Sequence, residues 1–246
     1  MLETIEQQTS ATPTWSILWL HGLGADGNDF APIVPQLLRP GWPGLRFVFP
    51  HAPVRAVTIN GGVQMRAWYD ILAFGNDFTR QEDASGVRAS IAQVEELLAC
   101  EGERGVPPSR VILAGFSQGG AIALAAGLRR TTPLAGIVAL STYLPLAAAS
   151  LAEATPAGHA TPVFMAHGSF DPVLPQQLGE RSRDALRGAG MAIEWRSYPM
   201  QHQVCAEEID ALAVWLGQRF AADCAGKNDC ANSEAGPTGE RQGRRE

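Results

Sequence analysis

The feature that most constrains this fold is a series of short apolar segments that alternate with longer amphipathic ones. In the segment 82–100, for example, Val87, Ile91, Val94 and Leu98 recur at helical spacing and form one apolar stripe. The apolar segments lack hydrophobic–polar alternation, which is typical of strands buried on both faces. We expect strands at 15–20, 45–49, 110–114, 134–140, 163–166 and 192–197, and helices at 82–100, 119–129, 176–188 and 206–220. This alternation predicts an α/β fold with a mostly parallel central sheet and helices on both of its faces.

A glycine-flanked serine follows the expected strand 110–114. Residues 115–119 read Gly-Phe-Ser-Gln-Gly, the G-x-S-x-G pattern, and an apolar helix follows directly. In such sheets the chemistry lies in loops at the carboxyl ends of the strands. A sharp strand-to-helix turn exposes the serine hydroxyl there, so the context predicts that Ser117 is a nucleophile. The alternative is a glycine-rich turn with an incidental serine.

A nucleophilic serine needs a base and an acid that orients the base, in the chain order serine, acid, histidine. His202 follows the last expected strand and precedes the last helix, which is the position of the base. Asp171 follows the strand 163–166 and is the expected acid, with a turn or helix cap before Pro172 as its alternative role. The other downstream candidates have the wrong order or lie in connecting loops, helices or the tail: His159, His167, Asp184, Asp210, Asp223 and Asp229.

Two backbone N–H groups are expected to stabilise an oxyanion. One belongs to Gln118, directly after the nucleophile. The other is expected at Leu23, in the glycine-containing loop 21–26 after the first predicted strand. The same loop can also simply connect this strand to a helix capped by Asn28 or Asp29, and both roles are compatible.

Composition narrows the function classes. The chain has 246 residues and a net charge of −6, so it lacks the basic footprint of a nucleic-acid-binding protein. Its four cysteines match no zinc-ligand spacing, and we expect no metal and no cofactor. The uncharged stretch 131–152 is interrupted by prolines, glycine and polar residues, which favours a buried strand and a loop over a membrane span. The first eight residues lack the pattern of a secretory signal, and we expect a cytoplasmic protein.

The chain is expected to consist of one large domain with a short segment at each end. Residues 221–246 contain no Val, Ile, Leu, Met or aromatic residue and are expected to form a flexible polar tail. We expect an N-terminal extension over 1–13 and one catalytic domain over 14–220. No insertion is long enough for a separate cap domain. The candidate covers of the site are 68–80 and 141–161.

Several motifs together resemble those of the bacterial carboxylesterase and acyl-protein thioesterase family of α/β hydrolases. They are HGLGADG at 21–27, PHAP at 50–53, MRAWYD at 65–70, GFSQGG at 115–120, YLP at 143–145, HG with DPV at 167–173, and His202 with Val204 and Cys205. The resemblance implies an α/β-hydrolase fold and metal-free ester hydrolysis. It also implies Ser117, Asp171 and His202 as the catalytic triad, with Leu23 and Gln118 as oxyanion donors.

The chain departs from the family pattern beside the site. Gln201 stands where the family usually has glycine, Gln203 where it often has serine, and Thr142 where it usually has a small residue. A glycine before the histidine can serve a positive φ or a lack of space. We expect an apolar acyl groove near these positions, although its candidate residues can also simply pack the core: Leu72, Phe74, Leu144 and Val173.

The sequence therefore predicts a serine carboxylesterase that acts on small to medium acyl esters. The alternative is an acyl-protein thioesterase or a lysophospholipase with the same triad. A non-catalytic binding protein of this fold and a hydrolase that uses Cys205 are less favoured, because the triad is intact and Cys205 begins a helix. The oligomeric state stays open between a monomer and a homodimer.

Overall fold

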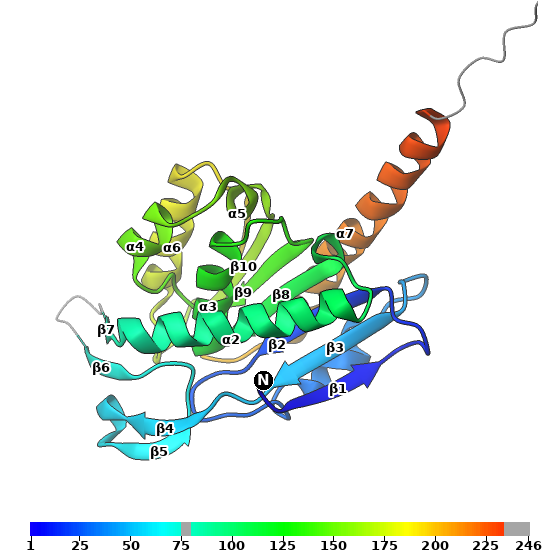
Figure 1. Cartoon of the computed structure of the whole chain (residues 1–246). Coiled ribbons are helices and arrows are strands. Elements are labelled where there is room, and N and C mark those ends of the chain that lie inside the picture. The colour runs from blue at the N-terminus through cyan, green and yellow to red at the C-terminus, as the bar shows by residue number, and fades with distance from the viewer. Residues whose placement is uncertain (75–79, 234–246) are drawn as a thin grey trace, which may run out of the picture.

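A twisted, mostly parallel sheet forms the centre of the protein (Figure 1). The computed structural model describes the backbone of residues 1–74 and 80–233, and the side chains of 1–73 and 82–222. Within these ranges the sheet has seven strands, and only β1 is antiparallel to its neighbour. Their order is β1 (Thr4–Gln8), β3 (Leu45–Pro50), β2 (Trp15–Leu20), β8 (Val111–Phe116), β9 (Gly136–Leu140), β10 (Val163–Gly168) and β11 (Ile193–Tyr198).

Helices cover both faces of this sheet and create two cores. Side chains of β2 alternate between the cores, because Leu18 and Leu20 pack on one face while Ile17 and Trp19 pack on the other. The first core receives α2 (Ala84–Glu103), α3 (Gln118–Leu128) and Leu186 of α6 (Gln176–Gly188). The second receives α1 (Val34–Leu37) and α7 (Ala206–Ser233). This two-sided burial explains the near-continuous apolar character of the strands.

Short elements lie beyond the carboxyl ends of the strands. They include two hairpins, β4 (Val54–Val57) with β5 (Val63–Arg66) and β6 (Ile71–Phe74) with β7 (Arg80–Glu82). The expected cover 68–80 contains β6 and the start of β7, and its residues 75–79 lie outside the described ranges. The expected cover 141–161 contains a loop with α4 (Ala147–Ala152) and α5 (Pro156–Ala160). The start of α5 lies at the far end of α3, where the Thr155 N–H donates to the Leu128 carbonyl oxygen at 2.9 Å. The described residues contain no separate cap domain.

Both ends of the chain contain regular secondary structure. Residues 1–13, expected as an extension, contain β1, which pairs with β3 at the edge of the sheet. The sequence of β1 is mostly polar because only part of an edge strand is buried. Residues 221–246 were expected to be a flexible tail, but α7 continues to Ser233 and projects beyond the sheet (Figure 1).

A buried carboxylate connects α2 to the strands at this edge. Glu101 accepts hydrogen bonds from the Ser16 hydroxyl and from the guanidinium groups of Arg46, at 2.7 Å, and Arg104, at 2.9 Å. Arg104 also pairs with Glu6 of β1 at 2.7 Å. The full set of partners satisfies a charge that would be costly to bury alone.

No helix in the described ranges combines the length and the apolar character needed to cross a membrane.

Candidate active site

Ser117 lies in a sharp turn between β8 and α3. Its backbone φ is 54° and ψ is −120°, a conformation that side-chain-bearing residues rarely adopt. The flanking glycines permit this turn because a Cβ on Gly115 would lie 2.4 Å from the Gly119 backbone, and one on Gly119 would lie 2.3 Å from the Leu20 carbonyl oxygen. The G-x-S-x-G spacing is therefore a consequence of close strand–helix packing. Ser117 itself is 8% exposed.

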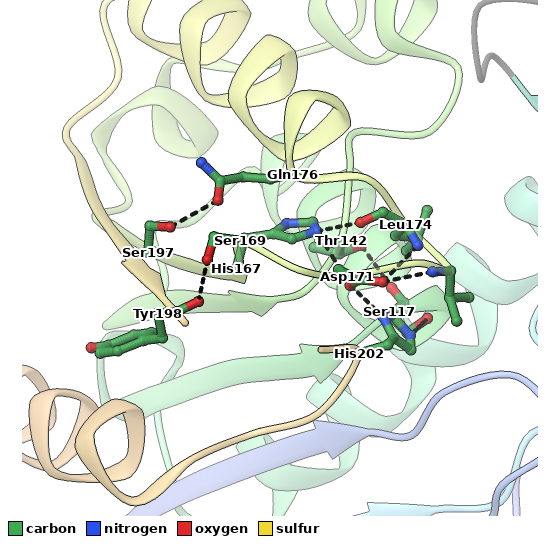
Figure 2. A network of polar contacts seen from close by, with 11 residues as sticks. Ser117, Thr142, His167, Ser169, Asp171, Leu174, Gln176, Ser197, Tyr198 and His202 are labelled. Atoms are coloured by element: carbon green, nitrogen blue, oxygen red, sulfur yellow. Dashed lines mark hydrogen bonds and ion pairs between the residues drawn. The ribbon is translucent and has the colours of Figure 1, made fainter. Parts of the chain in front are cut away.

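The structure brings the three predicted triad residues into one hydrogen-bonded chain (Figure 2). His202 Nε2 lies 2.9 Å from Ser117 Oγ, and His202 Nδ1 lies 2.6 Å from Asp171 Oδ2. The residues come from the loops after β8, β10 and β11 at the same end of the sheet. This geometry suits transfer of the serine proton to the imidazole.

The carboxylate of Asp171 is stabilised in its charged form. Its Oδ1 accepts hydrogen bonds from the backbone N–H groups of Val173 and Leu174, both at 2.8 Å. Burial raises the pKa of Asp171, but hydrogen bonds from His167, His202 and Leu174 outweigh it and hold the pKa well below its ordinary value. An ionised Asp171 accepts the Nδ1 proton of His202, which leaves the Nε2 lone pair toward Ser117.

A second histidine contacts the same carboxylate, which the sequence analysis did not predict. His167 is fully buried at the end of β10, and its Nε2 lies 3.5 Å from Asp171 Oδ2 and 2.8 Å from the Leu174 carbonyl oxygen. His167 therefore holds both ends of the turn that carries the acid (Figure 2). In the sequence, the only indication of this contact is that His167 stands at the end of a predicted strand, four residues before Asp171.

The expected oxyanion donors line the space beside the nucleophile. Gln118 is the first residue of α3, so its backbone N–H belongs to the positive end of a helix dipole. Leu23 lies in a loop that is fixed by a hydrogen bond of 2.9 Å from the Gly24 N–H to the Arg66 carbonyl oxygen. Both residues line the same cavity as Ser117.

The side chain of Gln118 has a further role that sequence reasoning missed. Its Oε1 accepts from the Trp68 N–H at 2.8 Å, and its Nε2 donates to the Tyr69 carbonyl oxygen at 2.7 Å. These bonds attach the segment that precedes the β6–β7 hairpin to the start of α3. The cover is thereby positioned by the residue directly after the nucleophile.

The cavity beside Ser117, here called the Ser117 cavity, has a volume of about 310 Å³. Of the predicted acyl-groove residues, Val173 lines it and is 54% exposed. Leu144 is 3% exposed and packs in the core, and Leu72 is 39% exposed but does not line the cavity. The side chain of Phe74 lies outside the described residues. The apolar lining that sequence reasoning missed comes from Ile71, in the cover 68–80, and from Ile59, in the turn between β4 and β5.

The three departures from the family pattern fit without distortion. Only Ser117, Ser141 and Leu146 have a positive φ among the described non-glycine residues, so Gln201 needs no glycine-like backbone. The side chains of Gln201 and Gln203 are exposed. Thr142 Oγ1 donates a hydrogen bond of 2.6 Å to the Ser117 carbonyl oxygen, which adds support to the strained turn.

Cys205 does not match the requirements of a nucleophile. Burial raises the pKa of its thiol above the ordinary value, so the reactive thiolate is disfavoured near neutral pH. The described residues also contain no group of three or more histidine, cysteine or acidic side chains that could hold a metal ion.

Comparison with known proteins agrees with the site geometry. A model of the phospholipase/carboxylesterase family matches residues 2–218. Acyl-protein thioesterase 1 of Neurospora crassa is 40% identical over 218 residues, which cover 85% of this chain and 89% of the relative. The crystal structure of SOBER1 from Arabidopsis thaliana is 30% identical, with a TM-score of 0.77 and coverage of 83% of this chain and 98% of that one. Acyl-protein thioesterase 2 of Zea mays is 29% identical, with a TM-score of 0.77 and coverage of 89% and 100%.

These relatives come from a fungus and two plants, so the resemblance extends beyond the bacterial members of the family. The family match and the parallel sheet with helices on both faces identify the fold as that of an α/β hydrolase. The chain belongs to the phospholipase/carboxylesterase family.

Proposed function

We propose that this protein is a serine carboxylesterase that hydrolyses small to medium acyl carboxylic esters without a metal or cofactor. The single observation that carries the proposal is the continuous chain from Ser117 Oγ through His202 to Asp171, at 2.9 and 2.6 Å. The adjoining cavity supplies space for an acyl group next to the nucleophile and the expected oxyanion donors.

The reaction proceeds in two balanced steps. Ser117 Oγ forms a bond to the ester carbonyl carbon while its proton passes to His202 Nε2. The backbone N–H groups of Gln118 and Leu23 stabilise the oxyanion. The carbon–oxygen bond to the leaving alcohol then breaks, and His202 returns the proton to that oxygen. Water attacks the acyl-enzyme by the same route and releases the carboxylic acid with free Ser117.

The second candidate is hydrolysis of acyl thioesters on proteins, or of lysophospholipids, by the same residues. Similarity to two proteins named acyl-protein thioesterases favours the first of these. The steps are identical, except that a thiol replaces the leaving alcohol. Comparing p-nitrophenyl acetate, longer p-nitrophenyl esters, a palmitoyl-thioester peptide and a lysophospholipid as substrates separates the candidates.

The nucleophile is tested by substitution and by labelling. Ser117→Ala should reduce kcat/KM for p-nitrophenyl acetate by at least about a thousandfold, because the nucleophile is lost while the rest of the site remains. Its circular dichroism and Tm should stay close to those of the wild type. Ser169→Ala, at an exposed serine outside the triad, is the matched control and should keep full turnover. A fluorophosphonate label should map to Ser117, and full turnover by Ser117→Ala would contradict the assignment.

We also propose a cytoplasmic location, which the free thiols of Cys100 and Cys205 support. Fractionation of the source cells tests it, with enrichment outside the cytosol as the contrary result. The oligomeric state is open between a monomer and a homodimer, and light scattering coupled to gel filtration decides it.

A further inference from the structure

Two hollows meet at the catalytic histidine. The first is the Ser117 cavity. The second is a larger groove of about 590 Å³, here called the His202 groove. Asp29, Phe116 and His202 line both hollows. Ser117 and the two expected oxyanion donors, Leu23 and Gln118, line only the first.

The His202 groove is built from segments that are far apart in the sequence. Pro32, Ile33 and Gln36 come from the region of α1, and residues 203–206 with Ile209 come from the start of α7. Between them lies a row of rings, because the Phe30 and Phe116 centroids are 5.4 Å apart and those of Phe116 and His202 are 4.8 Å apart. The groove is therefore partly apolar and continuous with the imidazole that moves the proton.

The chemistry of ester cleavage assigns different ends of a substrate to the two hollows. The acyl carbonyl must lie next to Ser117 Oγ and the oxyanion donors, and these residues line the Ser117 cavity. The leaving atom must lie next to His202 Nε2, which returns a proton to it. The rest of the leaving group then extends from His202, and the His202 groove is the larger space that begins there.

The charges around the groove narrow the class of leaving group. Asp29 is exposed where the two hollows meet, and none of the described residues that line either hollow is a lysine or arginine. Among these residues, a phosphate-bearing leaving group would meet a carboxylate and no cationic side chain. A neutral or cationic group with apolar parts fits this lining better.

We infer that the His202 groove binds the leaving group of the substrate, and that it favours a bulky, neutral or cationic one such as the cysteine of a peptide. This inference rests on the proposed function, because it assumes acyl transfer through Ser117 and His202. Asp29 is assigned as the residue that discriminates leaving groups by charge, and Gln36 and Ala206 lie at exposed positions along the groove.

The size of the leaving group is tested by filling the groove from an exposed position. Gln36→Trp should lower kcat/KM for a butyryl thioester of a ten-residue neutral peptide about tenfold or more relative to kcat/KM for the butyryl thioester of ethanethiol. Val214→Trp is the matched control, because Val214 is 65% exposed on α7 and lines neither hollow.

Acyl-chain length provides the reciprocal test. Val173→Trp, in the Ser117 cavity, should lower kcat/KM for an octanoyl thioester of ethanethiol more than for the acetyl one. Gln36→Trp should affect these two substrates equally. If Gln36→Trp instead discriminates by acyl length, the groove holds the acyl chain and the inference is overturned. Equal losses on the peptide and ethanethiol substrates would overturn it as well.

Charge is tested with peptide thioesters that carry either lysines or glutamates beside the acylated cysteine. The wild type should favour the lysine peptide, and Asp29→Asn should reduce that preference, measured as the ratio of the two kcat/KM values, about threefold or more. An unaltered preference contradicts the role of Asp29. Failure of the proposed function gives a different result, since the wild type would then hydrolyse neither these thioesters nor p-nitrophenyl acetate, and Ser117 would take no fluorophosphonate label.

Discussion

At the residue scale, Asp171 has more partners than the orientation of His202 requires. His202, His167 and two backbone N–H groups all contact its carboxylate. His167 Nε2 also donates to the Leu174 carbonyl oxygen, because a carbonyl oxygen can only accept. It therefore ties the carboxylate to the turn that holds it, and we consider it a positioning residue that acts through Asp171.

His167→Phe tests this role, because it keeps an aromatic ring in the buried site but removes the N–H donor. We expect kcat to fall about tenfold with little change in KM, since substrate does not contact this residue. The pKa of Asp171 should rise toward its ordinary value, because one hydrogen bond that favours the carboxylate is lost. His167→Gln places an amide donor near the Nε2 position and should recover most of kcat. Equal losses of kcat in His167→Phe and His167→Gln would show that the N–H donor has no positioning role.

At the element scale, the start of α7 controls the loop that carries His202. Cys205 precedes the helix and Glu208 lies three residues later, which is the spacing of a capping box. Glu208 is 0% exposed, and neither carboxylate oxygen has a hydrogen bond of normal geometry. Burial raises the pKa of Glu208 to about 8, and the Cys205 backbone only partly offsets this. The nearby Tyr198 hydroxyl has a pKa raised by burial to about 12 and stays neutral over the same pH range.

This carboxyl group predicts a specific pH dependence of stability. The ordinary pKa of 4.5 applies to the unfolded chain, which loses its proton at lower pH than the folded chain does. The folded state therefore binds more protons between about pH 4.5 and 8, and its free energy of unfolding falls as pH rises through this window. Glu208→Gln should remove this decline, so that the variant gains about 3 kcal/mol over the wild type between pH 5 and 7.5.

Urea unfolding at pH 5, 6.5 and 7.5 measures this difference. Glu207→Gln is the matched control, because Glu207 is exposed in the same helical turn and its pKa is lowered by backbone and Cys205 hydrogen bonds. Its stability should follow that of the wild type. Parallel curves for the wild type and Glu208→Gln would show that the Glu208 carboxyl is solvated.

The elements also show what sequence alone can predict. Five of the sheet strands, β2, β3, β8, β9 and β10, were predictable because each one buries both faces and therefore has its own apolar signature. Strand β11 is only partly buried and was located by its apolar start and the helix after it. Strand β1 was missed because its place comes from pairing with β3, and a mostly polar edge strand has no such signature. The hairpin strands were missed because each has only three or four residues and pairs outside the central sheet.

The residues of the site also differ in how far the sequence predicts them. Ser117, Asp171 and His202 could be predicted because chain order and strand ends specify them. Residues that line the cavity could not, because packing decides which side of a loop faces the nucleophile. Leu144 is apolar and close in sequence to the site, yet it packs in the core, while Ile59 reaches the cavity from the turn between two hairpin strands.

At the scale of the whole molecule, the triad is held between the two cores. Ser117 leads into α3, which packs in one core, and the His202 loop leads into α7, which packs in the other. The far end of this packed part of α7 is Phe220, whose ring lies 4.8 Å from that of Trp15 and 4.9 Å from that of Trp42. The position of the His202 loop thus depends on contacts along the length of the packed helix.

Truncation tests where the domain ends. Phe220 is buried, whereas Ala221 and Ala222 are exposed, so a chain that stops after Ala222 keeps every aromatic contact of α7. We expect its Tm and its kcat/KM for p-nitrophenyl acetate to equal those of the full chain within error. A chain that stops after Arg219 loses Phe220, and its free energy of unfolding should fall by about 3–5 kcal/mol, as for other buried phenylalanines. Phe220→Ala in the full chain should reproduce this loss, because the ring, and not the length of the helix, holds α7 to the sheet. If the chain ending at Ala222 is as unstable as the one ending at Arg219, residues beyond 222 belong to the folded domain.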